Sequence, residues 1–290
     1  MGNQRQIKRR IGTAKNISQI TKAMEMVSAS KMRRAQDQAM AARPYTRALQ
    51  ESLQKVSENI NPELHPLLQT HQEGKEVLLL VSTDKGLVGG LNNQLFKTTL
   101  HWLDEHADSL IVPIGRKAVL FCQLAGAQIH AQFTDLPEKI GTEDIAPITT
   151  LLTNGFLEKE FNRVSIVYMD FINTLSQKVR EIQLLPLQQS YYTENAPAAV
   201  QPQLKSEYVF EPSAGAILND LLPYYVENTI YQAFLEARAS EHSSRMVAMK
   251  NASENAGELV KELKLEFNKT RQASITNELL DITTASLTIT

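Results

Sequence analysis

The sequence predicts a small α/β domain flanked by two very long helices that pair as an antiparallel coiled coil. Three observations carry this prediction. Residues 13–43 contain neither glycine nor proline, and residues 224–290 contain only one such helix breaker, Gly257. Between about 61 and 205, short β-like runs alternate with helical ones. Uninterrupted helical segments on both sides of an alternating α/β stretch favour a coiled coil built from the two ends of the chain.

The amino-terminal segment is predicted to form one helix that ends near residue 58. Its apolar residues recur at steps of three and four, which places them on one face. These residues are Ile7, Ile11, Ala14, Ile17, Ile20, Met24 and Val27. Pro44 would normally end or kink a helix. Because Leu49, Leu53 and Val56 resume the helical spacing, we expect the helix to continue to a length of roughly 85 Å.

The middle segment is predicted to be a Rossmann-like α/β domain. Five β-like runs are expected at 76–82, 110–114, 128–133, 163–171 and 178–187. Helical runs are expected at 91–106, 116–125 and 143–159. Alternation of this kind predicts a mostly parallel sheet, and the last two strands are close enough to form an antiparallel hairpin at its edge. We therefore place the amino-terminal helix in 1–60, the α/β domain with its linkers in 61–205, and the carboxy-terminal helix in 206–290.

The carboxy-terminal segment is predicted to be helical from residue 224 onward, with a length on the order of 100 Å. Seven of its residues follow a strict alternation of four- and three-residue steps: Val226, Ile230, Ala233, Ala237, Ser240, Ser244 and Val247. This spacing indicates a coiled-coil seam, and its small residues allow two helices to approach closely. A helix of this length cannot pack along its whole length against a domain of about 130 residues. We expect it to project and to pair with the amino-terminal helix.

Charge is distributed unevenly along the chain. The net charge is −2 overall, made of +8 in residues 1–60, −5 in 61–205 and −5 in 206–290. A basic amino-terminal arm and an acidic carboxy-terminal arm suit two helices that lie against each other. Nucleic-acid binding is the rival explanation for the basic arm, but neither aromatic residues nor glycines interleave with its charges.

Composition gives no sign of a secreted or membrane-spanning chain. A single cysteine, Cys122, cannot form an internal disulfide. The longest apolar run, 77–81, is far shorter than the roughly 20 residues that span a bilayer. We therefore expect a cytosolic chain.

Motifs that carry chemistry are scarce. The turn from Asp84 to Asn92 is rich in glycine and follows the first predicted strand, where many folds bind phosphate. Its glycines lack the spacing of the known phosphate-binding loops, so we expect a tight structural turn with glycine at positive φ. The six histidines are scattered without the spacing of a helical zinc site. Cys122 lies in an apolar helical run and is predicted to be a buried small hydrophobe. No catalytic residue, cofactor or metal is expected.

The most distinctive stretches lie on the long helices, and they closely resemble the gamma subunit of F-type, proton-translocating ATP synthases. At the amino end the match covers 20–24 (ITKAM) and 31–35 (KMRRA), and at the carboxy end it covers 245–252 (RMVAMKNA) and 275–282 (ITNELLDI). The turn 84–92 is similar to the D-[KR]-G-L-x-G-G-x-N turn of that family. The resemblance covers essentially the whole chain. It departs at Thr284, Ala285 and Ser286, where the family usually has a glycine–glycine–alanine run.

The resemblance implies a mechanical role rather than catalysis. The paired helices would form the central rotor shaft inside a hexamer of three alpha and three beta subunits, coupling proton flow through the membrane sector to ATP synthesis or hydrolysis at the beta subunits. Further partners would be the epsilon subunit and the c-ring. Because no transit peptide precedes the first motif, we expect a bacterial complex, with the chain peripheral to the cytoplasmic face of the inner membrane.

The resemblance also implies which residues do the coupling. The residues expected to face the beta subunits are Lys22, Met24, Arg245, Arg271, Gln272, Thr276 and Glu278. If the helices are antiparallel, Met24 is expected to lie near the segment from Arg271 to Glu278. Glu207, Tyr208 and the α/β domain are expected to contact the epsilon subunit and the c-ring.

Two hypotheses of other classes stay open on the sequence. One is an enzyme whose α/β domain binds a nucleotide and carries the coiled coil as an appendage. The other is a coiled-coil scaffold or nucleic-acid binder that uses the basic arm. Nucleotide titration would discriminate the first, and salt-sensitive retention on DNA the second.

Overall fold

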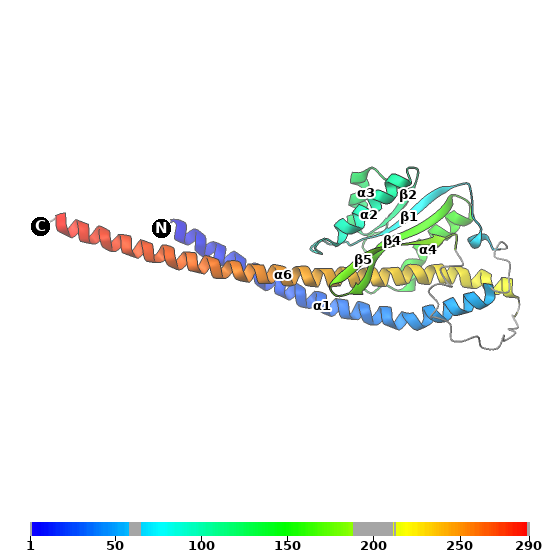
Figure 1. The fold of residues 1–290 in the computed structure, drawn as a ribbon, viewed down its shortest axis with the longest axis horizontal. Coiled ribbons are helices and arrows are strands. Elements are labelled where there is room, and N and C mark those ends of the chain that lie inside the picture. The colour runs from blue at the N-terminus through cyan, green and yellow to red at the C-terminus, as the bar shows by residue number, and fades with distance from the viewer. Residues whose placement is uncertain (1, 58–64, 188–210, 212, 289–290) are drawn as a thin grey trace. The chain divides into compact units, whose positions relative to one another are not determined.

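Two long helices begin and end the fold in the computed structural model, which describes residues 2–57, 65–187, 211 and 213–288 (Figure 1). Helix α1 spans Gly2–Ser57 and continues through Pro44, as predicted. Helix α6 spans Ala214–Thr288. The predicted start of α6 at residue 224 is wrong, because the helix begins earlier and contains Pro223. Leu218 and Leu222 are buried on its added turns. Burying two leucines contributes roughly 1.5–3 kcal/mol each, which offsets the roughly 3 kcal/mol that an internal proline costs.

A five-stranded mixed sheet follows α1, with strand order β3-β2-β1-β4-β5. The strands are β1 Lys75–Val81, β2 Leu110–Ile114, β3 Gln128–Ile129, β4 Phe161–Asn173 and β5 Ser176–Leu185. All neighbours pair in parallel except β4 and β5, which form the predicted antiparallel hairpin. The third strand is shorter than predicted, because beyond β3 only an isolated bridge between Ile114 and Phe133 continues the pairing.

Helices cover both faces of the sheet. Helices α2 (Leu91–Glu105) and α3 (Arg116–Ala125) pack on one face, where Leu78 and Leu80 of β1 meet Leu95 and Cys122. Helix α4 (Thr142–Leu157) lies on the other face, and a short 3-10 turn, η2 (Pro66–Leu68), precedes β1. Because β1 is buried on both faces, its sequence is a continuous apolar run rather than an alternating one.

Both long helices contribute to the second face of the sheet. Leu49, Leu53 and Val56 of α1 are buried in one apolar cluster together with Val226 and Ile230 of α6. By compactness the chain divides into two units. The first joins the residues up to Ala29 with those from Arg245 onward, and the second runs from Ser30 to Ser244. The boundaries placed near residues 60 and 205 lie outside the described residues.

A partly buried polar cluster lies within this second unit, where Glu236 of α6 meets Tyr168 of β4. The Glu236 carboxylate accepts hydrogen bonds from the Tyr168 hydroxyl at 2.9 Å and from Gln232 Nε2 at 3.0 Å. Burial raises the pKa of Glu236, and the nearby carboxylate of Asp170 raises it further, whereas the Gln232 hydrogen bond lowers it. Burial likewise raises the pKa of the Tyr168 hydroxyl. The protonated form of Glu236 is thus favoured by folding.

A pH titration of stability checks this assignment. A carboxyl whose pKa is raised by folding stabilises the native state fully below its unfolded pKa of about 4.3, and this contribution is lost as pH rises through the folded pKa. Glu236→Gln, a neutral isostere, should therefore gain stability relative to the unmodified chain as pH rises from 4 to 8. Urea unfolding midpoints measure the difference. A relative loss for Glu236→Gln over this range would contradict the assignment.

Gly155 is a position where packing demands the absence of a side chain. A Cβ atom there would lie 2.2 Å from Cε2 of Phe161, which is fully buried. We expect Gly155→Ala to lower the free energy of unfolding by about 1–3 kcal/mol, because overpacking outweighs the better helix propensity of alanine. The matched control is Gly215→Ala, where a Cβ meets nothing within 4 Å. A stabilised Gly155→Ala chain in urea unfolding would contradict this account of the packing between α4 and β4.

Candidate functional site

The first unit is an antiparallel pair of helix ends. Ser18 Oγ donates to the carbonyl of Ser253 at 3.2 Å, and Ser253 Oγ donates in return to the carbonyl of Ser18 at 3.1 Å. Nearer the amino terminus, Gln4 Nε2 donates to the carbonyl of Thr270 at 3.4 Å. From Gln4 to Ser18 the residue numbers increase along α1, while those of their partners decrease along α6 from Thr270 to Ser253. These contacts therefore fix the antiparallel direction and the register of the two helices.

The register corrects the expected position of Met24. Continuing from the pair Ser18 and Ser253, Met24 lies level with about residue 247 of α6. It is therefore not close to the segment from Arg271 to Glu278, which lies at the level of the start of α1 and beyond. Antiparallel pairing alone could not predict this, because the register depends on contacts between particular side chains. Met24 itself is half-buried, and Arg245 lies at nearly the same position along the axis of the helix pair.

Lys22 and Arg245 differ in their exposure. Lys22 is exposed, and its Nζ forms an ion pair with Glu25 Oε2 at 2.9 Å one turn along α1. The i,i+3 spacing and the exposure make this a weak pair. The Arg245 side chain, by contrast, is only 9% exposed.

Four of the predicted coupling residues lie together near the carboxy-terminal end of α6. Arg271, Gln272, Thr276 and Glu278 are all exposed. Thr276 Oγ1 donates to the carbonyl of Gln272 at 3.0 Å, which uses the hydroxyl within the helix. Arg271 and Glu278 are two turns apart on the same face. Neither of them forms an ion pair within the described ranges of the chain.

Two exposed apolar stripes lie in the first unit, one on α1 and one on the part of α6 that extends beyond the level of the start of α1. On α1, Ile17 is 47%, Ile20 60% and Val27 54% exposed. Of the seven residues predicted to share one face of this helix, Ile7 and Ala14 are buried, so that face is not covered along its whole length. On α6, Ile275 is 49%, Leu279 58% and Ile282 65% exposed. The steps of three, four and seven put each set on one helix face. Exposed apolar surface of this kind marks a site of contact with another molecule.

Sequence reasoning missed the second stripe, although its signal was present. Ile275, Leu279 and Ile282 recur at steps of four and three, as do the residues predicted to share one face of α1. Apolar residues at helical spacing indicate that one face of a helix is in contact with something. They do not indicate whether that contact is with the partner helix or with a different chain. The register shows that the stripe of α6 lies beyond the start of α1, so α1 does not cover it.

The glycine-rich turn after β1 is held by its own side chains. Asn92 Nδ2 donates to Thr83 Oγ1 at 2.8 Å, and Thr83 Oγ1 donates to the carbonyl of Lys85 at 2.9 Å. The expectation of positive φ at glycine is met at Gly89, with φ of 57°, but Leu87 also has a φ of 62°. These internal contacts support the prediction of a structural turn.

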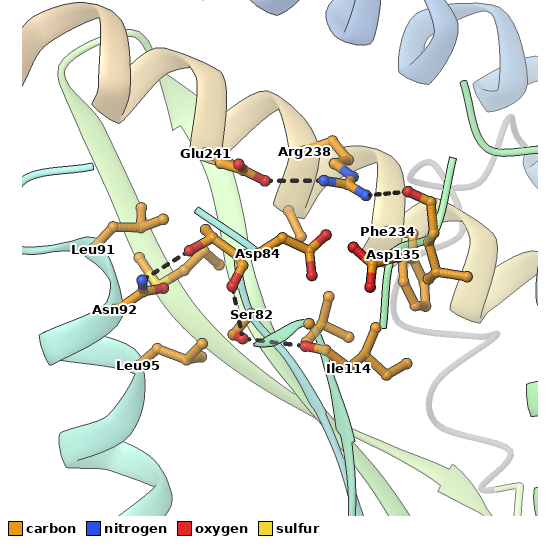
Figure 2. A pocket seen from close by; sticks show the side chains of 16 residues that line it. Ser82, Asp84, Leu91, Asn92, Leu95, Ile114, Asp135, Phe234, Arg238 and Glu241 are labelled. Atoms are coloured by element: carbon orange, nitrogen blue, oxygen red, sulfur yellow. Dashed lines mark hydrogen bonds and ion pairs between the residues drawn. The ribbon is translucent and has the colours of Figure 1, made fainter. Parts of the chain in front are cut away.

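The crevice beside this turn is closed by α6. Parallel α/β sheets bind ligands outside the carboxyl ends of their strands, where the strand order reverses. Figure 2 shows Phe234, Arg238 and Glu241 of α6 placed over that crevice, next to Ser82 and Asp84. They leave a cavity of about 20 Å³, enough for about one water molecule. A nucleotide would need a pocket of roughly 300–1,000 Å³. The hypothesis of a nucleotide-binding enzyme at this turn therefore finds no space in the crevice.

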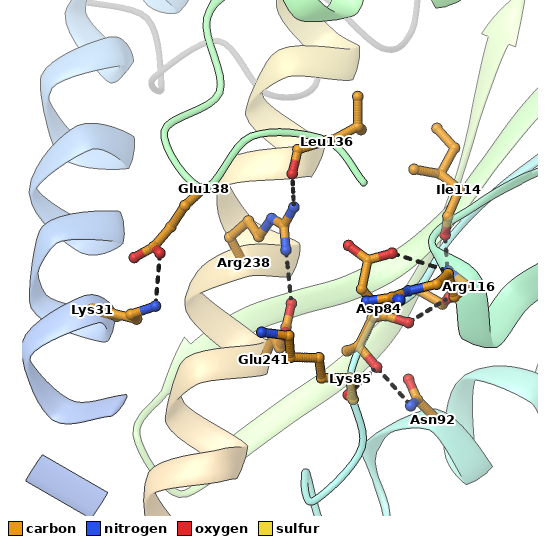
Figure 3. A network of polar contacts seen from close by, with 12 residues as sticks. Lys31, Asp84, Lys85, Asn92, Ile114, Arg116, Leu136, Glu138, Arg238 and Glu241 are labelled. Carbon is orange, nitrogen blue, oxygen red and sulfur yellow. Dashed lines mark hydrogen bonds and ion pairs between the residues drawn. The ribbon is translucent and has the colours of Figure 1, made fainter. Parts of the chain in front are cut away.

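Charged groups around the crevice pair with one another (Figure 3). Arg238 donates to Glu241 Oε2 at 3.2 Å and to the carbonyl of Leu136 at 3.4 Å. Lys31 of α1 forms a 2.7 Å ion pair with Glu138, and its hydrogen bond lowers the pKa of that carboxyl. The contacts tie α1, α6 and the segment around Leu136 together inside the second unit.

The single cysteine and the side chains that could bind a metal are the remaining groups with chemical reactivity. Cys122 is fully buried, and burial raises the pKa of its thiol to about 11, which leaves little reactive thiolate at neutral pH. In the described part of the chain, no cluster of three histidine, cysteine or acidic side chains could hold a metal ion. Among the same residues, no helix has the length and apolar character to cross a membrane. Glu207 and Tyr208 lie outside the described residues.

Similar proteins were found over the whole chain. The family model described as ATP synthase matches residues 3–287. The ATP synthase gamma chain of Akkermansia muciniphila is 43% identical over 289 residues, with 98% of each chain covered. That of Glaesserella parasuis is 40% identical over 293 residues, with 100% of each covered.

Solved structures give the same picture of the fold. A chain from the central stalk and c-ring of the Tetrahymena thermophila mitochondrial ATP synthase superposes with a TM-score of 0.62 at 26% identity, covering 81% of this chain and 99% of that one. A chain of the Euglena gracilis mitochondrial enzyme reaches 0.69 at 18% identity, covering 99% and 95%, and supports the fold alone. The paired helix ends, the mixed sheet and these relatives agree: the chain belongs to the gamma-chain family of ATP synthases.

Proposed function

We propose that the chain is the central rotor stalk of an F-type ATP synthase and couples proton flow through the membrane sector to ATP synthesis or hydrolysis. The observation that carries the proposal is the pair of exposed apolar stripes on antiparallel helix ends. On a coiled coil without partners, such stripes would raise the free energy of the chain, since they keep apolar surface in contact with water. Enclosure by other subunits removes this cost. Family membership supports three alpha and three beta subunits as that enclosure.

The proposed mechanism is a shift of conformational populations. Three identical beta subunits surround one shaft that has no threefold symmetry, so each beta subunit meets a different helix face. Contacts that favour one beta conformation over another bias its equilibrium by the difference in contact energy. Reversing a 1:99 ratio to 99:1 takes about 5.5 kcal/mol. A few hydrogen bonds and buried apolar side chains supply that amount, and turning the shaft would pass the bias from one site to the next.

The coupling residues are assigned roles within this mechanism. Arg271 and Gln272 would meet carboxylates and polar groups of the beta subunits, where a charge-assisted hydrogen bond contributes roughly 1.5–3 kcal/mol. Their exposure supports the assignment, because no fold-internal contact has to be broken. Thr276 and Glu278 lie on the same exposed end. Lys22, Met24 and Arg245 would act at a second level of the shaft.

The chain itself is proposed to be non-catalytic. ATP chemistry would take place on the beta subunits, and the closed crevice of the sheet supports this division of labour. The α/β unit, with Glu207 and Tyr208, would contact the epsilon subunit and the c-ring. The complex would place the chain at the cytoplasmic face of a bacterial inner membrane, peripheral to the bilayer.

Reconstitution tests the proposal. The chain is mixed with alpha and beta subunits, and assembly size and ATP hydrolysis are measured. We expect one copy of the chain in a complex with three alpha and three beta subunits, and hydrolysis that depends on all three components. If the folded chain fails to associate with alpha and beta subunits, the proposal is wrong. Nucleotide titration of the isolated chain serves as the control and should show no binding.

Met24→Lys should impair coupling. The register places Met24 near the level of Arg245, so a lysine there adds a second cation to a half-buried position. We expect protons pumped per ATP hydrolysed to fall while hydrolysis continues, measured in vesicles that contain the assembled complex. Met40→Lys is the matched control, since Met40 is on the same helix but 54% exposed. An unchanged pumping ratio in Met24→Lys would contradict the assigned role.

A further inference from the structure

The amino-terminal turns of α1 carry positive charge without any negative charge. Residues 1–24 contain six lysine or arginine residues and no aspartate or glutamate. The last of the six, Lys22, is paired with Glu25. The other five have exposed side chains and form no ion pair among the residues that the structure describes: Arg5, Lys8, Arg9, Arg10 and Lys15.

Three of these cations share one side of the helix. Arg5, Lys8 and Lys15 are separated by three and seven residues, which places them on one face of α1. We call these three residues the basic face. Ile7 and Ala14, which are buried, directly precede Lys8 and Lys15 in the sequence and are therefore turned by about 100° from them. The basic face thus lies outside the buried seam of the helix pair.

Helix α6 does not neutralise this charge. Residues 245–290 contain six basic and six acidic residues, a net charge of zero, whereas residues 1–29 carry +5. Glu258, Glu262 and Glu266 of α6 lie at the level of the basic face, by the register of the pair. All three are exposed, and within the described ranges none forms an ion pair with α1. The net positive charge of the first unit is therefore carried by α1.

This distribution of charge is unfavourable in the isolated chain. Like charges one and two turns apart on a helix repel each other. The amino-terminal end of a helix also carries partial positive charge, so lysine and arginine destabilise it there. A partner with negative charge would remove both effects. Natural sequences break such local rules mainly at functional sites, which indicates that the basic face meets another molecule.

The surroundings of the basic face favour acidic protein side chains over nucleic acid as the partner. Residues 1–44 contain no aromatic residue on which a base could stack. The same helix continues into the exposed apolar residues Ile17, Ile20 and Val27. An apolar surface beside a polar one is the usual composition of a protein–protein interface. A phosphate backbone would pair with the cations but would leave the apolar residues in water.

We propose that the basic face of α1 binds acidic side chains of the alpha and beta subunits that enclose the first unit. The identity of the partner rests on the proposed function, whereas the basic face rests on exposed cations without ion pairs. Because complementary charge speeds association, the attraction would guide the helix pair into its enclosure during assembly. The apolar stripes would then supply contacts that salt does not screen.

Neutralising the basic face tests the proposal. The variant is Arg5→Gln/Lys8→Gln/Lys15→Gln, and its rate of association with a preassembled complex of alpha and beta subunits is measured at about 0.1 M and about 0.5 M salt. At the lower concentration we expect association at least about tenfold slower than for the unmodified chain. At the higher concentration the two rates should differ by less than about twofold, because salt screens the attraction.

A matched control removes three charges elsewhere. Lys97→Gln/Lys159→Gln/Lys178→Gln changes three exposed lysines of the second unit and should associate at the rate of the unmodified chain. Circular dichroism of each isolated chain checks its folding. The variant without the basic face should unfold at the same temperature as the unmodified chain or at a higher one, since repulsion within α1 is relieved.

Several outcomes would overturn the proposal. Equal association of the neutral variant and the unmodified chain at about 0.1 M salt would show that the basic face has no acidic partner in the complex. Equal slowing at both salt concentrations would indicate a structural defect rather than a lost attraction. Retention of the unmodified chain on double-stranded DNA, lost in a neutral variant that still associates normally, would assign the face to nucleic acid. If the unmodified chain fails to associate at all, the proposed function itself is wrong.

Discussion

The shared apolar core between the sheet and the two long helices is the contact on which the other features depend. Leu49, Leu53 and Val56 of α1 and Val226 and Ile230 of α6 are buried against the same face of the sheet. Each buried aliphatic side chain contributes roughly 1.5–3 kcal/mol. This core anchors the second part of α1 and the first part of α6 in one unit. The same helices then continue into the antiparallel pair that carries the coupling residues. Each of the two helices therefore contributes residues to both units.

The antiparallel pair combines a narrow seam with an uncovered outer surface. Small residues such as Ala14 and Ala256, and the reciprocal serine contacts of Ser18 and Ser253, allow close approach of the helices. A seam of small residues buries little area, so it leaves large apolar side chains outside. Ile17, Ile20 and Val27 of α1 are the result, whereas Leu279 is exposed because it lies beyond the level at which α1 begins. A central stalk that turns relative to the subunits around it needs contacts that are apolar, weakly directional and spread over several faces. We expect directional contacts at only a few residues, such as Arg271.

Much of the fold could be predicted from the sequence, because its signals are local. The apolar run of β1, the hairpin of β4 and β5 and the passage of α1 through Pro44 all follow from periodicity and turn spacing. The start of α6 could not be predicted, because a proline such as Pro223 usually ends or begins a helix. The helix extends past it because Leu218 and Leu222 are buried in the tertiary structure. The residues proposed for coupling were selected by resemblance, and neither the burial of Arg245 nor the half-burial of Met24 was deducible from the sequence. The position of Met24 and the exposure of Ile17, Ile20 and Val27 required the helix register, which depends on side chains far apart in the sequence.

Direct observation of rotation tests the central claim. The complex of this chain with alpha and beta subunits would be immobilised through the beta subunits, and a bead would be attached to the chain at Lys97→Cys, an exposed position on α2. Native Cys122 should not compete for the label, because it is buried and burial raises the pKa of its thiol to about 11. The account predicts that ATP drives rotation of the bead in one direction, at a rate proportional to hydrolysis. Full-rate hydrolysis with a stationary bead would contradict it.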